Sequence, residues 1–264
     1  MLSVEMTAAI SERIRGSLEP FPGATVVLLC VKVGASFPWY EEAHVGLNER
    51  LLEVRNEMDA NKIPTVETVE FWEGLYQRSV TPWELGTFSP PLKTFLDSPY
   101  KVPQGHVAVL GCGTGHDALL FAQYGYIVTA FDFAPSAIAS TKAKFAQYGY
   151  LDKTARTIQQ DIFDLHHFIG QFDYVLEHTC FCAIHPARRK NYELIVRDLL
   201  KPDGKLIALW WLLERQGSGP PFSLSKDELF ELFASDFRFD MVHEPTDSVP
   251  DRQGQELFTL LSKY

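Results

Sequence analysis

Three closely spaced glycines, Gly111, Gly113 and Gly115, directly follow the apolar run 106–110. Glycine allows the tight turn between a strand and a helix, and it lets a ligand approach the backbone closely. The G-x-G-x-G spacing differs from the G-x-G-x-x-G of dinucleotide-binding folds, and no lysine follows that would hold a phosphate. The segment therefore predicts a strand–loop–helix binding site for a ligand without a pyrophosphate.

An acidic residue, Asp132, ends the next predicted strand, 127–131. A carboxylate at that place can accept hydrogen bonds from both hydroxyls of a ribose. Together with the glycine loop it favours a nucleoside ligand, and S-adenosylmethionine fits that description; Phe133 is expected at the same site. A nicotinamide dinucleotide site and a purely structural turn are the alternatives.

A second acidic position, Asp161, follows the predicted strand 155–159 and precedes Ile162 and Phe163. An aspartate there can accept a hydrogen bond from an adenine amino group while its apolar neighbours pack on the ring. An Asx turn with ordinary core packing explains the same residues equally well.

Three aromatic residues, Trp72, Tyr76 and Trp83, precede the glycine loop. The spacing of Trp72 and Tyr76 puts both on one face of a helix. Their rings could hold a sulfonium cation at roughly 0.5–2 kcal/mol per contact. The alternative is that they are aromatic residues of the core.

Two histidines and two cysteines are close together at His178, Cys180, Cys182 and His185. Such soft ligands could bind zinc or a thiophilic metalloid. The segment lacks the usual C-x₂₋₄-C spacing, so the sequence predicts no metal site.

The elements that must position these residues alternate along the chain from Phe71 onward, as short apolar runs and amphipathic segments. Such alternation is typical of an α/β fold with a mostly parallel, buried sheet. Two closing strands without a helix between them predict an antiparallel hairpin at one edge. The predicted strands are 106–110, 127–131, 155–159, 172–177, 205–211, 237–242 and 256–261, and the predicted helices are 117–124, 135–147, 186–200 and 224–234.

Composition limits the classes of protein that remain. The chain has 264 residues, of which 46% are hydrophobic and 22% charged, which excludes an extended disordered protein. Its net charge of −10 argues against nucleic acid or an anionic membrane as partner. No apolar run is long enough to cross a bilayer, and no basic region opens the chain. Four cysteines without a paired framework suggest a reducing compartment, so a cytoplasmic protein is expected.

Several segments together resemble a known family. The glycine loop, Asp132 and residues 172–184 resemble class I methyltransferases, and more specifically the thiopurine S-methyltransferase-like family in its thiol and halide methyltransferase branch. Residues 71–86 are similar to the cofactor lid of that family, residues 219–222 to its G-P-P-F loop, and residues 249–256 to its closing segment. The resemblance implies a Rossmann-like fold with a seven-stranded, mostly parallel sheet, an antiparallel last strand and helices on both faces.

The resemblance also implies roles for single positions. The positions that it places at S-adenosylmethionine are Trp72, Tyr76, Trp83, Gly111, Gly113, Asp132, Asp161, Ile162 and Glu177. His178 stands at the end of the fourth strand, beside the methyl donor and the acceptor, and is the candidate base or orienting donor. Apolar walls for the acceptor are expected from Phe181, Trp211, Pro221 and Phe222.

The chain departs from the family at two of these positions. Tyr76 stands where tryptophan is usual, and His178 stands where the halide branch commonly has tyrosine and the thiopurine enzymes have arginine. Without that arginine, a bulky anionic thiopurine is a less favoured acceptor.

The expected function is in-line transfer of a methyl group from S-adenosylmethionine to a small soft nucleophile, namely a thiol, hydrosulfide or halide. The alternatives are a metalloid or a larger natural-product thiol as acceptor, or a cofactor-binding interaction protein without significant catalysis. Residues 67–264 are expected to form the methyltransferase domain, with residues 67–100 as cofactor lid. Residues 1–66 are expected to be an N-terminal extension, with helical segments at 4–18 and 41–58 and a strand-like run at 24–33. The sequence leaves the role of this extension and the oligomeric state open.

Overall fold

The fold centres on a seven-stranded sheet. The computed structural model describes residues 66–214 and 219–264, so the segments expected within residues 1–66 lie outside the described residues. The strand order is β3-β2-β1-β4-β5-β7-β6. The strands are β1 (His106–Leu110), β2 (Ile127–Asp132), β3 (Ala155–Gln159), β4 (Phe172–His178), β5 (Leu200–Trp211), β6 (Phe237–His243) and β7 (Glu256–Lys263).

The sheet is parallel from β3 to β5 and antiparallel at its other end. β1 pairs in parallel with both β2 and β4, β2 pairs with β3, and β4 pairs with β5. β7 lies between β5 and β6 and is antiparallel to both. The predicted mostly parallel sheet with an antiparallel last strand is therefore confirmed, and the closing hairpin β6–β7 lies at one edge.

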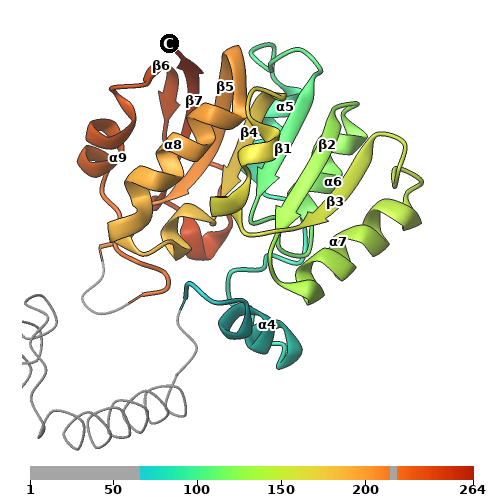
Figure 1. Cartoon of the computed structure of the whole chain (residues 1–264). Helices are drawn as coiled ribbons and strands as arrows, with labels where there is room; N and C mark the ends of the chain where they lie inside the picture. Colours follow the sequence, from blue (N-terminus) through green and yellow to red (C-terminus); the bar gives the residue numbers. More distant parts are fainter. Residues whose placement is uncertain (1–65, 215–218) are drawn as a thin grey trace, which may run out of the picture. The chain divides into compact units, whose positions relative to one another are not determined.

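Helices cover both faces of the sheet, as expected (Figure 1). Alternate residues of each strand point to opposite faces, so Val107 and Val109 of β1 join one core cluster while Ala108 and Leu110 join the other. The first cluster contains α5 (Pro90–Asp97), α6 (His116–Gln123) and Phe145 of α7 (Pro135–Gln147). The second contains α8 (Arg189–Leu199) and α9 (Lys226–Phe233).

Local signals explain where several helices begin. α7 starts with Pro135 at its first position, where the missing N–H costs nothing. Ser225 caps α9 by accepting a hydrogen bond from the backbone N–H of Glu228. The predicted helix 186–200 is divided into a short 3₁₀ turn, η4 (Pro186–Arg188), and α8. The other 3₁₀ turns are η1 (Ile162–Asp164), η2 (His166–Phe168), η3 (Phe181–Ala183) and η5 (Pro250–Arg252).

The helix α4 (Val69–Gln77) lies beyond the carboxyl ends of the parallel strands (Figure 1). It holds Trp72 and Tyr76 on one short helix, as their spacing predicts. None of its residues is fully buried. This position is the one that a lid over those strand ends would occupy. We use the name lid segment for residues 67–100, which the resemblance implies as a cofactor lid.

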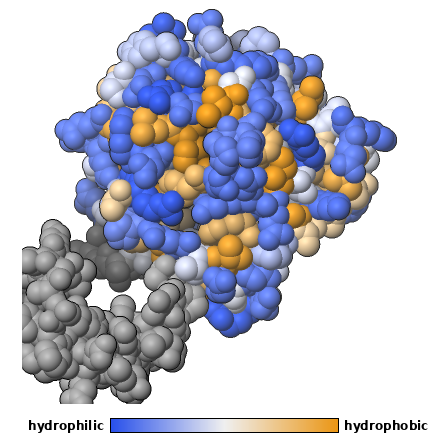
Figure 2. Space-filling view, in the orientation of Figure 1, coloured by the Kyte–Doolittle hydropathy of each residue, from blue (hydrophilic) through white to orange (hydrophobic). Residues whose placement is uncertain are grey.

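The face of the protein drawn in Figure 2 is mostly polar. On the face that Figure 2 shows, hydrophilic residues dominate the described part, and apolar residues form smaller patches between them. Across residues 66–214 and 219–264, the structure contains no helix with the length and apolarity needed to cross a membrane.

Candidate functional site

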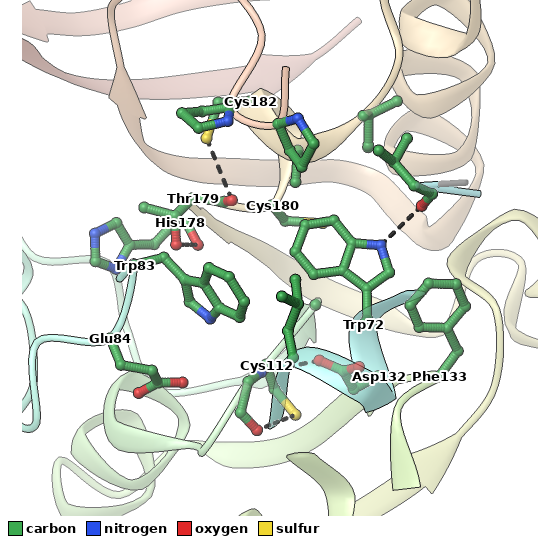
Figure 3. A pocket seen from close by; sticks show the side chains of 18 of the residues that line it. Trp72, Trp83, Glu84, Cys112, Asp132, Phe133, His178, Thr179, Cys180 and Cys182 are labelled. Carbon is green, nitrogen blue, oxygen red and sulfur yellow. Dashed lines mark hydrogen bonds between the residues drawn. The ribbon is translucent and has the colours of Figure 1, made fainter. Parts of the chain in front are cut away.

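A cavity of about 630 Å³ opens at the carboxyl ends of the parallel strands. In open parallel sheets this is the edge where ligands bind, because the loops leaving adjacent strands diverge there. Its walls come from the segment 66–87 with α4, the glycine loop, the ends of β2 and β4, and residues 161–163, 182–188 and 220–221. Figure 3 shows labelled side chains of these segments around one shared space.

The glycine loop forms one wall of this cavity. Gly111 and Gly113 have positive φ angles of 58° and 55°, which other residues adopt at a cost. A Cβ at Gly111 would lie 2.7 Å from Sγ of Cys180, and one at Gly113 would lie 2.9 Å from Oε1 of Glu84. The loop thus tolerates only glycine at both places, and it leaves its backbone open toward a ligand.

Asp132 lies at the end of β2 beside this loop and is only 7% exposed. Its Oδ2 accepts from the backbone N–H of Gly113 at 3.0 Å, and its Oδ1 accepts from that of Ala134 at 2.9 Å. Burial raises the pKa of Asp132 to about 6, although the hydrogen bonds from Ala134 and Gly113 oppose this rise. Each carboxylate oxygen keeps a second lone pair, so the pair of hydroxyls of a ribose fits the remaining acceptors.

The three predicted aromatic residues meet in one cluster and line the cavity. The ring of Trp83 is edge-on to Trp72 at 5.3 Å and to Tyr76 at 5.7 Å between centroids. Trp72 donates its indole N–H to the carbonyl of Val66 at 2.7 Å. Burial raises the pKa of Tyr76, so its hydroxyl stays neutral. The cluster offers ring faces suited to a sulfonium cation.

Two carboxylates that the sequence analysis did not single out attach the lid segment to the sheet domain. Glu84 accepts from the backbone N–H of Thr114 at 3.1 Å and from its hydroxyl at 2.6 Å. Glu73 accepts from the backbone N–H of Ser136 at 2.9 Å and from its hydroxyl at 2.6 Å. Ser136 lies in the first turn of α7, so Glu73 caps that helix from outside.

His178 lines the cavity, but both of its ring nitrogens have partners. Nδ1 lies 2.7 Å from Oδ2 of Asp117, and Nε2 lies 3.0 Å from a guanidinium nitrogen of Arg252. Arginine can only donate, so Nε2 must accept and the ring hydrogen must be on Nδ1. Burial would raise the pKa of Asp117, yet His178 and the backbone N–H of Ser89 hold that pKa below its ordinary value. The two contacts therefore fix the orientation of the ring in the cavity wall.

Arg252 extends this network to the lid. It is 3% exposed, donates to the carbonyl of Trp83 at 2.7 Å, and stacks 4.7 Å from the ring centre of Trp211. Glu256 balances its charge at 3.6 Å. The chain of contacts from Asp117 through His178 and Arg252 thus ends on the backbone of an aromatic lid residue.

Three residues predicted for the site lie elsewhere. Glu177 is 1% exposed, and its carboxylate accepts from the backbone N–H of Phe181 at 2.8 Å and from the hydroxyl of Tyr192 at 2.5 Å. Neighbouring residues on a strand point to opposite faces, so His178 faces the cavity while Glu177 faces α8. Phe181 is fully buried against Tyr192 and Trp210.

Phe222 is likewise not among the lining residues. Its ring lies edge-on to His185 at 5.4 Å between centroids, so it supports the wall from outside. The remaining predicted residues, Phe133, Asp161, Ile162, Trp211 and Pro221, do line the cavity. Asp161 accepts from the backbone N–H of Phe163 at 2.9 Å, which is the Asx turn, and its second oxygen is left for a ligand.

The cysteines near the site behave as buried thiols. Burial raises the pKa values of Cys112 and Cys180, and it raises that of Cys182 to about 12. Cys182 donates to the carbonyl of Thr179 at 3.4 Å. Within residues 66–214 and 219–264, no group of three or more His, Cys, Asp or Glu is arranged to hold a metal ion.

A family model and a curated relative both match most of this chain. The family model described as "Thiopurine S-methyltransferase (TPMT)" matches residues 67–261. Thiocyanate methyltransferase 1 of Arabidopsis thaliana is 31% identical over 209 residues, which cover 74% of this chain and 90% of that protein.

Two solved structures illustrate the similarity in fold. One, described as "Conversion of a Disulfide Bond into a Thioacetal Group during Echinomycin Biosynthesis", has a TM-score of 0.62 at 21% identity and covers 74% of this chain and 91% of its own. The other, a 1,6-didemethyltoxoflavin-N1-methyltransferase of Burkholderia thailandensis with bound S-adenosylhomocysteine, has a TM-score of 0.50 at 19% identity, covering 87% and 91%.

Proposed function

Because this chain belongs to the thiopurine S-methyltransferase family, we propose that it methylates small soft nucleophiles that are already anionic in solution. S-Adenosylmethionine-dependent methyl transfer to a thiol-type acceptor is its activity. The proposal concerns which acceptors are used: thiolates, hydrosulfide, thiocyanate and halides, rather than acceptors that an enzyme must deprotonate.

The observation that carries this proposal is that both ring nitrogens of His178 already have hydrogen-bond partners. Its Nε2 accepts from Arg252 and its Nδ1 donates to Asp117, so no lone pair of the ring is available to an acceptor. A general base must come within hydrogen-bond reach of the proton it removes. His178 is therefore proposed to line and order the acceptor side, and not to act as the base.

The chemistry does not need a base for such acceptors. A free thiol with a pKa near 8.5 is already a few per cent thiolate at pH 7. Full deprotonation by the enzyme would lower the apparent activation free energy by only about 2 kcal/mol. Alignment of donor and nucleophile and exclusion of water supply most of what an in-line displacement requires.

The described residues suit the cofactor, which when bound supplies an electrophilic methyl group on a sulfonium. We propose that Asp132 binds the ribose, that Asp161 and Ile162 hold the adenine with Phe133, and that Gly111 and Gly113 lie under the methionine part. The rings of Trp72, Tyr76 and Trp83 would face the sulfonium and exclude water from it. Asp132 is the strongest of these assignments because its free lone pairs lie beside the glycine loop.

Two further features of the proposal concern the setting. The thiols of Cys112, Cys180 and Cys182 are free, which supports a reducing location such as the cytoplasm. The net charge of −10 supports small molecules, and not nucleic acid, as partners.

The test is release of S-adenosylhomocysteine by the purified full chain with iodide, thiocyanate, hydrosulfide, methanethiol and an aromatic thiol as acceptors. The pH profiles distinguish an enzyme that deprotonates its acceptor from one that uses an acceptor already ionised in solution. We expect kcat/KM for thiocyanate not to rise with pH through ionisation of the acceptor, because thiocyanate is already an anion. In contrast, kcat/KM for each thiol should rise with the fraction of that thiol present as thiolate. His178→Asn should lower both without removing the thiol's dependence on its pKa.

A different profile would contradict the proposal. If kcat/KM for a thiol instead reached a plateau at a pH well below the thiol's own pKa, and His178→Asn restored a rise that follows the thiolate fraction, His178 would be a base after all. Absence of turnover across the panel, with S-adenosylmethionine still bound, would exclude small acceptors altogether.

A further inference from the structure

The charges around the cavity are unevenly distributed. Five carboxylates line it, namely Glu67, Glu84, Asp117, Asp132 and Asp161. Arg188 is the single Arg or Lys among the described residues of the lining. The carboxylates favour a cation such as a sulfonium, and Arg188 is the place in the described lining where a side-chain charge favours an anionic group.

Arg188 has no carboxylate partner in the described part of the chain. Its guanidinium lies 3.5 Å from the ring centre of Phe163, and no ion pair within 4.0 Å involves it, whereas the next residue, Arg189, is paired with Glu228 and bonded to the carbonyl of Ser223 at 2.9 Å. Stacking uses only the flat face of a guanidinium. Its N–H edge therefore remains available to a planar anion, which it can bind through two parallel hydrogen bonds.

His185, three residues before Arg188, adds a second donor to the same rim. Its Nδ1 accepts from the backbone N–H of Ala187 at 3.3 Å, so the hydrogen of the neutral ring is on Nε2. His185 is exposed, lines the cavity and contacts Phe222. The turn 185–188 thus presents two N–H donors between Phe163 and the proline loop at 220–222.

We propose that Arg188 and His185 form an anion subsite that binds a carboxylate or sulfonate on the acceptor, so that thiols with such a group are preferred over neutral thiols. This inference rests on the proposed function. The subsite belongs to the acceptor because the cofactor part expected beside Phe163 is the adenine, which has no negative charge. The cofactor's own carboxylate is expected with its methionine part, on the glycine loop.

The test compares 3-mercaptopropionate with its methyl ester, with S-adenosylhomocysteine release as the measurement on the full chain. The quantity is the ratio of kcat/KM for the acid to that for the ester. We expect Arg188→Met to lower this ratio at least about tenfold, because methionine keeps an unbranched stem on Phe163 but has no charge. The two thiols differ in acidity, but this difference is the same for both enzymes and cancels when their ratios are compared.

Three further variants test separately the paired hydrogen bonds of Arg188, the N–H donor of His185 and the effect of removing a positive charge elsewhere. Arg188→Lys should keep part of the preference, since it retains the charge and loses the paired hydrogen bonds. His185→Asn should keep the turn, because asparagine can accept from Ala187, while it loses Nε2–H. Lys142→Met removes an exposed positive charge of α7 outside the cavity lining and should leave the ratio unchanged.

Each outcome supports or overturns the subsite. An unchanged acid-to-ester ratio in Arg188→Met overturns it. So does a rise of KM for S-adenosylmethionine with the ratio unchanged, which would assign Arg188 to the cofactor. Failure of the proposed function is distinct, because it would show as no turnover of either the acid or the ester by the unaltered chain.

Discussion

At the scale of single residues, we propose that one buried carboxylate serves both the fold and cofactor binding. Asp132 accepts hydrogen bonds from the backbone N–H groups of Gly113 and Ala134, and its remaining lone pairs are available to a ligand. In the free protein its burial favours the protonated form, and the bound hydroxyls of a ribose would favour the charged form. Binding and ionisation of Asp132 are therefore coupled.

The first prediction follows from this coupling. The affinity for S-adenosylmethionine should increase between about pH 5 and pH 7, as Asp132 ionises with a pKa of about 6. Asp132→Asn should weaken binding at least about tenfold at pH 7.5, since charge-assisted hydrogen bonds are lost, and should flatten this pH dependence. Calorimetric titration at several pH values measures both. A variant with the original affinity would remove Asp132 from the cofactor site.

The second prediction concerns Glu177, which is buried against Tyr192. Burial raises the pKa of Glu177 from 4.5 to about 7 in the folded protein. Its contribution to stability is therefore fully present below pH 4.5 and is lost as the pH rises through 7. Glu177→Gln lacks this loss, so its free energy of unfolding relative to the original chain should improve by about 2 kcal/mol from pH 5 to pH 8.

Urea unfolding at the two pH values checks the effect. Glu70→Gln is the matched control, because Glu70 is an exposed residue of α4. A difference that does not change with pH would show that Glu177 is ionised without penalty.

At the scale of elements, the lid segment is attached to the sheet domain by hydrogen bonds rather than by a buried apolar face. α4 has no fully buried residue, while Glu73, Glu84 and the carbonyl of Trp83 each bond to a distant segment. These contacts join residues far apart in the chain, and they hold the aromatic cluster over the cavity.

The third prediction addresses this attachment. Glu84→Ala should raise KM for S-adenosylmethionine about tenfold, because Thr114 loses both hydrogen bonds and the lid loses one anchor. The rate at saturating cofactor should change less, since the acceptor side of the cavity is untouched. Steady-state kinetics with Glu70→Ala as the control measures the effect. Equal kinetics of the two variants would show that the lid does not depend on Glu84.

At the scale of the whole molecule, the described lining of the cavity and the match to the family model fall in the same part of the chain. The described lining begins at Val66, and the family model begins at residue 67. We propose that residues 67–264 are the methyltransferase domain, with the lid in residues 67–100, and that residues 1–66 are an N-terminal extension.

The fourth prediction is that a chain starting at residue 64 stays active. Its KM for S-adenosylmethionine and its kcat for a small thiol should differ from those of the full chain by less than about threefold, because no described lining residue is removed. Circular dichroism establishes that the shortened chain is folded before the kinetics are compared. A folded but inactive product would assign the extension to catalysis.

The features that could be predicted from the sequence are those set by local spacing. The glycine loop, Asp132 and Asp161 each follow a strand, and the carboxyl ends of parallel strands meet at one edge, so their meeting at one cavity follows from the order of elements alone. The boundaries of β1, β3 and α7 agree with the prediction. The short apolar run of β1 and the proline at the start of α7 are local signals. The sequence analysis does not include α5, although its buried residues Leu92, Phe95 and Leu96 have helical spacing.

Only the tertiary structure decided which of two neighbouring side chains faces the cavity. It also decided which distant groups form hydrogen bonds with that side chain. His178 and Glu177 are adjacent, and the pleat turns one to the cavity and the other to α8, whereas Phe181 enters the core. Arg252 reaches both His178 and the lid from the segment before β7. The sequence alone determined the fold class, the family and the cofactor edge; the partners of its polar groups depend on contacts between remote segments, which local patterns do not encode.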